Sequence, residues 1–168
     1  MNTKSLHLIC YGLYLVTSKK DGKYNGQIVN TVFQVTSNPV TIAVSINKQN
    51  LTHEYISASG VFAVSILSKD TPLPFIGRFG FRSGRETEKL EGINFKIGKT
   101  GVPIVSDNAL TWLEAKVMTK LDINSHSLFI GEVVDADVSA DGEPMTYAYY
   151  RLVKKGGVPK TAPTYMEE

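Results

Sequence analysis

Apolar and polar residues alternate along much of this chain with a period of two, which places every second side chain on one face of a β-strand. The stretches concerned are rich in the β-branched and aromatic residues that favour strands. They span residues 40–46, 61–67, 112–121, 128–138 and 147–153, and an apolar stretch at 6–16 is the expected first strand. The pattern therefore predicts a mainly β fold.

Two Asp-Gly pairs mark turns between expected strands. Asp21-Gly22 and Asp141-Gly142 suit type I′ turns, because glycine readily adopts the positive φ that these turns require. Hairpins of this kind join antiparallel strands. We therefore expect an antiparallel barrel or sandwich rather than a parallel α/β sheet.

Three short helices are expected between the strands. The first is expected at residues 50–56, which start with capping residues, and it is expected to end at Gly60. Two more are expected at 74–79 and around 85–90. Both lie within 68–106, a stretch with many prolines and glycines that is expected to leave the barrel as a long excursion. Excursions of this length inside a compact domain are usually functional.

The composition excludes several classes of protein. Eighteen Lys and Arg residues against sixteen Asp and Glu residues leave a net charge of +2, too balanced for a nucleic-acid partner. A single cysteine, Cys10, cannot form an internal disulfide or by itself a metal site, which fits a reducing cytoplasm. Apolar runs are shorter than the roughly 20 residues that cross a bilayer, so no membrane association is expected. A signal peptide is the alternative to a strand at 6–16, but His7 and Gly12 interrupt that run.

A strand end, a polar turn and a helix start at residues 45–53 form the first candidate site. The free N–H groups of a first helical turn favour an anion, as does the helix dipole. Lys48 adds a positive charge, and Asn50 and Thr52 add hydrogen-bond donors. This chemistry suits a phosphate group. Taken alone, a helix cap that binds nothing is the commoner explanation.

The second candidate is the strand expected at 29–39, which carries amides and hydroxyls that a barrel core does not require. Gln34 and Thr36 share one face with Asn30, and such a row could hydrogen-bond the edge of a flat heterocycle. An exposed strand face explains the same pattern equally well.

Two further candidates are a basic loop and a histidine. Arg82 and Arg85 flank a Ser83-Gly84 turn and suit a phosphate or a planar anion, although a solvated loop is the commoner explanation. His126 could orient a cofactor or donate a proton near neutral pH, although a lone histidine is more often structural. The sequence motifs of serine hydrolases, zinc peptidases, P-loop proteins and Rossmann domains are absent. Cofactor chemistry or binding remains.

The order of these segments resembles the flavin reductase-like family of FMN-binding split barrels, which includes flavoredoxins and the flavin domains fused to rubredoxin. The matching segments are 11–18 (YGLYLVTS), 26–39, 44–53 (VSINKQNLTH), 62–67 (FAVSIL), 81–85 (FRSGR), 126–133 (HSLFIGEV) and 159–165 (PKTAPTY). The resemblance therefore extends from about residue 5 to 165.

This resemblance implies a six-stranded antiparallel Greek-key split barrel with a few short helices, formed by one domain over residues 1–168 with a tail at about 154–168. It also implies FMN bound close to the interface of a homodimer. By family position, the flavin ring is assigned to Asn30, Thr31, Gln34, Val35 and Thr36, and the ribityl phosphate to Ser45, Asn47, Lys48, Asn50 and Thr52. Arg82, Ser83 and Arg85 match the loop that closes on the flavin, His126 matches a catalytic position near the nicotinamide or flavin, and Tyr165 could cover the ring from the tail.

The activity that the resemblance implies is a cytoplasmic, FMN-dependent oxidoreductase. NAD(P)H would reduce the flavin, which would pass electrons to ferric iron, a rubredoxin or oxygen. One alternative is a flavoredoxin-like carrier that moves electrons without using NAD(P)H. Another is a binding module for haem or a different planar ligand. The terminal acceptor and the choice between NADH and NADPH stay open.

Two departures from the family pattern affect these expectations. Related chains often continue into a C-x-x-C rubredoxin module after the tail, whereas this sequence stops at Glu168, so an iron partner is expected to be a separate protein. Ser125 precedes His126 where many reductases carry aspartate. This weakens the case for a charged, catalytically tuned histidine and for efficient use of NAD(P)H.

Overall fold

The computed structural model describes residues 2–166, with the backbone alone described at Thr3 and Lys4. Its strands are β1 (Tyr14–Lys20), β2 (Lys23–Val29), β3 (Val32–Ser37), β4 (Val40–Asn47), β5 (Val61–Leu67), β6 (Phe95–Ile97), β7 (Pro103–Val105), β8 (Ala109–Ile123) and β9 (His126–Val138). The 3₁₀ helix η1 (Thr3–Leu8) and the helices α1 (Leu51–Ser59), α2 (Leu73–Gly80) and α3 (Tyr147–Leu152) complete the regular elements of this range. The mainly β class is confirmed.

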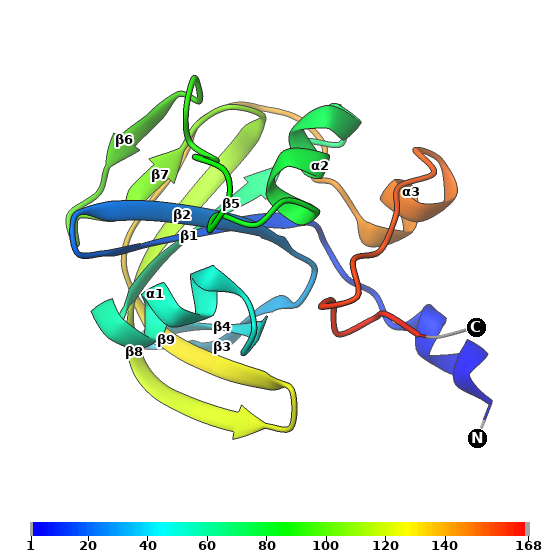
Figure 1. Cartoon of the computed structure of the whole chain (residues 1–168), viewed down its shortest axis with the longest axis horizontal. Helices are drawn as coiled ribbons and strands as arrows, with labels where there is room; N and C mark the ends of the chain where they lie inside the picture. The colour runs from blue at the N-terminus through cyan, green and yellow to red at the C-terminus, as the bar shows by residue number, and fades with distance from the viewer. Residues whose placement is uncertain (1, 167–168) are drawn as a thin grey trace.

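Seven of the described strands form one antiparallel sheet in the order β2-β1-β5-β8-β9-β4-β3, and β6 pairs with β7 separately (Figure 1). The expected count of six strands is therefore wrong by one. β2 and β3 lie at the two edges of the sheet, each held by a hairpin partner on one side. The result is one continuous sheet of seven strands with two free edges among the described residues.

The core shows how far the sheet curls. Val29 on edge strand β2 packs in the same buried cluster as Val44 on β4, together with Phe62 on β5 and Phe129 on β9. Strands from opposite ends of the sheet therefore enclose one core. A second cluster joins Leu13 and strand β1 to helices α2 and α3 on the outside of the sheet.

The first Asp-Gly turn is confirmed. Asp21 (φ 49°) and Gly22 (φ 75°) connect β1 to β2 with positive φ at both positions, and the strands pair in register from Lys20–Lys23 to Tyr14–Val29. Two expected helices are also confirmed as α1 and α2. Helix α1 ends at Gly60, which is left-handed (φ 69°) and donates its N–H to the Ile56 carbonyl.

The strand expected at 147–153 is wrong, because this segment forms helix α3. The Thr146 hydroxyl accepts a hydrogen bond from Tyr149 N and caps the first turn, and Tyr147 and Tyr150 lie one turn apart. Asp141-Gly142 therefore connects β9 to a helix and does not form a hairpin.

The helix expected around 85–90 is also wrong, because the segment forms a series of turns. The Arg78 guanidinium donates to the carbonyls of Glu88 and Glu91, so α2 holds this segment through its backbone. Lys89 turns into the interior instead of lying on a helix face.

The strand expected at 6–16 starts only at Tyr14. Residues before it form η1 and an exposed connection, with Leu8 83% exposed and Cys10 on the surface. The backbone N–H of Leu13 donates to the Met145 carbonyl, which ties the residue before β1 to the segment before α3. Cys10 is therefore not a core residue.

Candidate functional site

A pocket of about 380 Å³ opens at one end of the curled sheet, where elements distant in the sequence meet. Strand β2, the start of α1, the end of α2 and the loop after it form its walls, with residues 157–163 of the tail on another side. Eight of the sequence-predicted site residues line it: Asn30, Ser45, Asn47, Asn50, Thr52, Arg82, Ser83 and His126. The structure therefore brings the helix start, the basic loop and the histidine together.

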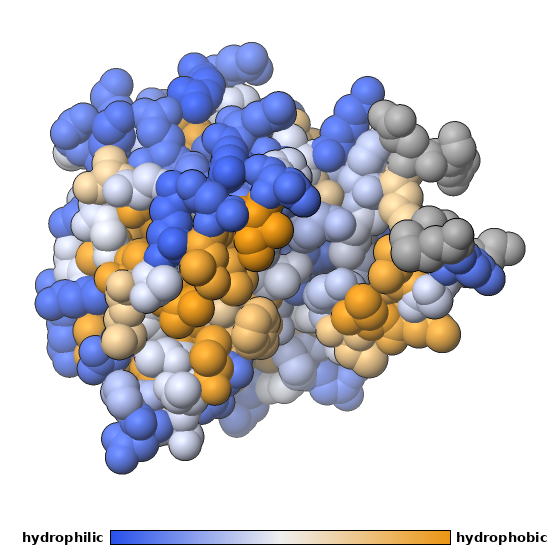
Figure 2. Space-filling model, turned by 90° about the horizontal axis from the view of Figure 1, so that it is seen from below, coloured by the Kyte–Doolittle hydropathy of each residue, from blue (hydrophilic) through white to orange (hydrophobic). Residues whose placement is uncertain are grey.

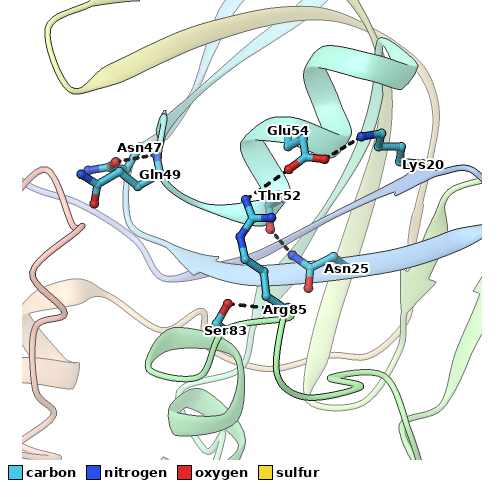
Figure 3. Close-up of polar contacts among 8 residues, drawn as sticks. All are labelled: Lys20, Asn25, Asn47, Gln49, Thr52, Glu54, Ser83 and Arg85. Carbon is cyan, nitrogen blue, oxygen red and sulfur yellow. Dashed lines mark hydrogen bonds and ion pairs between the residues drawn. The ribbon is translucent and has the colours of Figure 1, made fainter.

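The N-terminus of α1 opens into this pocket. Asn50 occupies the N-cap position, yet within the described residues its side chain makes no capping hydrogen bond. The N–H groups of the first turn are therefore not capped by that side chain. Asn25 Nδ2 donates to Thr52 Oγ1 over 2.8 Å, which leaves the Thr52 hydroxyl proton available to a ligand (Figure 3). Together with the helix dipole, this arrangement favours an anion.

The basic loop is fastened to α1 by a charge cluster beside the pocket. Glu54 on α1 accepts from Lys20 Nζ at 2.6 Å and from Arg85 Nη2 at 3.1 Å (Figure 3). These two cations hold the pKa of Glu54 below its usual value. Arg85 is therefore engaged with Glu54 and is not among the residues that line the pocket.

A glycine permits the loop to approach β2 closely. A Cβ at Gly84 would lie 2.0 Å from Asn25 Oδ1, a separation that no side chain tolerates. Ser83 Oγ accepts a hydrogen bond from Arg85 N and holds the turn. The loop thus presents Ser83 and Arg82 to the pocket while its backbone packs on Asn25.

Lys89 is a lining residue that the sequence reasoning missed. Its side chain is only 6% exposed, and its Nζ donates to the carbonyls of Gly26 (3.0 Å) and Phe79 (3.1 Å). Burial lowers the pKa of Lys89 to about 8. None of the described carboxylates forms an ion pair with it, so its positive charge lacks a counter-ion in the protein. Segments that are distant in sequence bury Lys89, so the spacing of nearby residues could not have identified it as a site residue.

Gln27 is a second missed residue. Its Oε1 atom is buried and has no hydrogen-bond partner among the described residues, and its side chain lines the pocket. A buried acceptor without a donor costs free energy, about 1–3 kcal/mol. Asn25 and Gln27 alternate along β2 on the same face as the core residue Val29. Two polar residues on an inward-facing side of a strand are a signal that the sequence alone could have given.

His126 has partners at both ring nitrogens. Nε2 lies 3.2 Å from the Thr161 carbonyl, and Nδ1 lies 2.9 Å from Ser125 Oγ. Since a carbonyl only accepts, Nε2 carries the proton, and the Ser125 hydroxyl donates to Nδ1 in the neutral ring. Burial lowers the pKa of His126, and the Thr161 carbonyl opposes this shift in part.

The remaining predicted residues lie outside the pocket lining. Gln34, Val35 and Thr36 are exposed on β3, where a register shift between Gln34 and Thr36 breaks the strict alternation on which their grouping rested. Thr31, Lys48, Arg85 and Tyr165 are also absent from the lining. Thr31 acts indirectly, because its hydroxyl donates to Asn30 Oδ1 over 3.0 Å.

Within residues 2–166, no helix has the length and apolar character to span a bilayer. In the same range, no three His, Cys, Asp or Glu residues gather in a way that could hold a metal ion.

Comparisons with known proteins identify the family of this chain. A family model described as "Flavin reductase like domain" matches residues 6–156. High molecular weight rubredoxin of Moorella thermoacetica is 56% identical, over 98% of this chain and 72% of that protein. Ferric-chelate reductase (NAD(P)H) of Archaeoglobus fulgidus is 53% identical, over 99% of both chains.

Solved structures share the fold. Flavoredoxin from Methanosarcina acetivorans superposes with a TM-score of 0.72 at 23% identity, over 78% of this chain and 70% of that one. The flavin reductase HpaC complexed with NADP+ has a TM-score of 0.74 at 25% identity, over 86% and 90% of the two chains. Motif order, fold and sequence relatives agree that this chain belongs to the flavin reductase-like family of oxidoreductases.

Proposed function

We propose that this protein is an FMN-dependent reductase that uses NAD(P)H and passes electrons to a separate acceptor. The observation that carries the proposal is the charge of the pocket. Arg82, Lys89 and Lys160 line it beside the N-terminus of α1, and no carboxylate is found among the described lining residues. A cationic pocket of this size suits a phosphorylated small molecule.

The residues present fit FMN at three points. The start of α1, Ser83 and Lys89 supply donors and positive charge for the phosphate. Gln27 Oε1 is an unused acceptor for a donor such as the N–H of the flavin ring. Ile28, Phe79, Phe81 and Tyr147 provide apolar wall for the ring.

Bound FMN would supply the capacity to accept a hydride and release electrons singly. The chain's own groups bind, orient and shield it. Lys89 and the α1 dipole would hold the phosphate, and Gln27 Oε1 would accept a hydrogen bond from a polar edge of the ring. The cationic lining also stabilises negative charge that develops during reduction.

Anaerobic titration of FMN-reconstituted protein with NADH and then NADPH tests the activity. The Archaeoglobus relative is named for reduction of ferric chelates with NAD(P)H, and this supports a nicotinamide donor and a ferric acceptor here. We expect one nicotinamide to bleach the flavin bands and ferric citrate to restore them. A protein that binds no FMN would overturn the proposal.

A carrier function is the second candidate, favoured by the state of His126. Both ring nitrogens are engaged, by Ser125 and by the Thr161 carbonyl, so the ring does not offer a free donor to the pocket. A carrier would bind FMN without being bleached by either nicotinamide. Reduction by a rubredoxin instead would establish it, and the name of the Moorella relative supports such a partner.

We also propose that the protein is a homodimer. Large apolar side chains are exposed on β3, β4 and β8, which lie in the half of the sheet with the order β8-β9-β4-β3: Phe33, Val35, Val40, Met118, Leu121 and Ile123. Figure 2 shows apolar residues gathered on the side of the molecule where these strands lie. Burial against a second copy would remove this surface from water. Sedimentation should give twice the chain mass, and Met118→Asp should lower it.

A further inference from the structure

The tail crosses the pocket as a strap, which we define as residues 157–164. Residues 157–163 line the pocket, and Thr164 contacts two other parts of the chain. Asn30 Nδ2 donates to Thr164 Oγ1 over 2.9 Å, and the Tyr147 hydroxyl lies 3.0 Å from the same oxygen. The His126 ring holds the Thr161 carbonyl. Three elements far apart in the sequence therefore hold the strap.

The start of the strap is fixed on α3. The Tyr150 hydroxyl donates to the Gly157 carbonyl over 2.8 Å, and Gly156 N donates to the Tyr150 carbonyl. A Cβ at Gly156 would lie 2.0 Å from the Tyr150 ring, so only glycine fits. Lys155 just before it is left-handed (φ 57°). The chain thus changes direction at a defined point and enters the strap from a rigid base.

The strap is also ordered within itself. Ala162 N donates to the Pro159 carbonyl and Tyr165 N donates to the Ala162 carbonyl, which makes two successive turns. Pro159 and Pro163 restrict the backbone further. A segment with this little freedom loses little entropy on closing, so a few hydrogen bonds can keep it in place.

We propose that Thr164 and Tyr147 are positioning residues that latch the strap closed, and that opening of this latch limits release of FMN from the pocket. This inference rests on the proposed function, because it requires FMN as the ligand. The latch explains why Asn30 and His126, which were expected to contact the flavin ring, direct polar atoms to the tail. The strap shields the ligand from water and keeps it bound between turnovers.

The experiment measures FMN release and strap opening separately. Release is followed by mixing reconstituted protein with excess apoflavodoxin, which captures free FMN. Thr164→Val removes the shared hydroxyl, and we expect release to accelerate about five- to 30-fold, as for the loss of one or two hydrogen bonds. Tyr147→Phe should give about fivefold. Tyr149→Phe, which removes a hydroxyl from the same helix, should match the wild type, and Thr164→Ser should restore slow release.

Strap opening is measured without FMN by the rate of trypsin cleavage after Lys160, an exposed strap residue. We expect Thr164→Val and Tyr147→Phe to be cleaved faster than the wild type and Tyr149→Phe. Faster cleavage with unchanged FMN release would overturn the proposal, as would no change in either. A wild-type protein that fails to bind FMN would overturn the proposed function and the retention role with it, while the cleavage rates would still show whether the latch exists.

Discussion

The two ends of the pocket are built in different ways. The anion end is largely local, because Ser45, Asn47, Asn50 and Thr52 lie within eight residues on a strand end and the helix that follows. The strap end joins Asn30, His126, Tyr147 and Thr164, and one of its hydrogen bonds connects residues 134 positions apart.

This difference has a physical consequence. A helix N-terminus presents N–H groups and a dipole wherever it forms, so its affinity for anions depends on local structure. The strap end exists only when the sheet, α3 and the tail are all folded. We therefore expect changes at the anion end to alter affinity for FMN, and changes at the strap end to alter stability and rates of exchange.

The largest effect is expected from Lys89, a cation that is distant in sequence from α1 and is buried at the anion end. Lys89→Met removes the charge, and we expect FMN affinity measured by fluorescence quenching to fall about 10- to 100-fold, as for a hydrogen bond to a charged group. Lys48→Met, on an exposed residue outside the lining, should change affinity far less. Lys23→Met on the distant hairpin serves as the control.

Because Lys89→Met also loses the bonds to Gly26 and Phe79, Lys89→Gln is the companion variant, since its amide can still donate to one carbonyl. Thermal unfolding of both variants separates folding from binding. Two well-folded variants with unchanged FMN affinity would show that Lys89 does not contact the ligand.

The pH dependence of FMN affinity also tests the role of Lys89. Burial lowers the pKa of Lys89 from 10.5 to about 8. A bound anion would raise this pKa again, so binding takes up a proton, and we expect FMN affinity to fall above about pH 8, by at most about tenfold per pH unit. Titrations at several pH values measure this, and a profile that Lys89→Gln leaves unchanged would refute it.

Without FMN, the protein's stability changes with pH in the opposite direction to its FMN affinity. Between pH 8 and 10.5 the folded protein binds fewer protons at Lys89 than the unfolded chain does. The free energy of unfolding therefore gains a contribution from Lys89 as pH rises through this window, and the contribution is lost again as pH falls from 10.5 to about 8. Urea titrations of wild type and Lys89→Gln at pH 7 and 9 measure the difference.

At the strap end, removing the cap of α3 is expected to have a moderate effect. Thr146→Ala loses the bond from Tyr149 N, and helix caps of this kind contribute about 1 kcal/mol. For a chain of this size the midpoint of thermal unfolding should fall by roughly 2–4 °C. Thr119→Ala, on an exposed position of β8, is the control. An unchanged midpoint would show that α3 does not depend on this cap.

The smallest effect is expected at the charge cluster that links the two sides of the anion end. Glu54→Gln breaks the pairs with Lys20 and Arg85, but all three side chains are partly exposed, and solvent screens such pairs. We expect FMN affinity to change by less than about twofold. A larger loss would mean that Arg85 must be held in place for the ligand to bind.

Features that depend on neighbouring residues could be predicted from the sequence, and features that depend on distant contacts could not. The Asp21-Gly22 hairpin, helix α1 with its Gly60 end and strand β5 at residues 61–67 depend on neighbouring residues and were predicted. The strand expected at 147–153 was wrong because the Thr146 cap and the contact between the Tyr147 and Tyr150 rings favour a helix, whereas the aromatic content of the segment had suggested a strand. Gln34 and Thr36 were grouped by alternation, which the register shift in β3 interrupts.

The sequence by itself determined the antiparallel β class and the helix start that favours an anion, because each follows from spacing and residue type over a few positions. The family followed from the resemblance of segments along most of the chain. The tertiary structure alone decided that Lys89 is buried with no counter-ion among the described residues, that Gln27 has no donor partner among them and that the tail closes over the pocket. These features depend on which distant segments exclude water from one another. Burial of this kind is a property of the folded chain, and no local pattern encodes it.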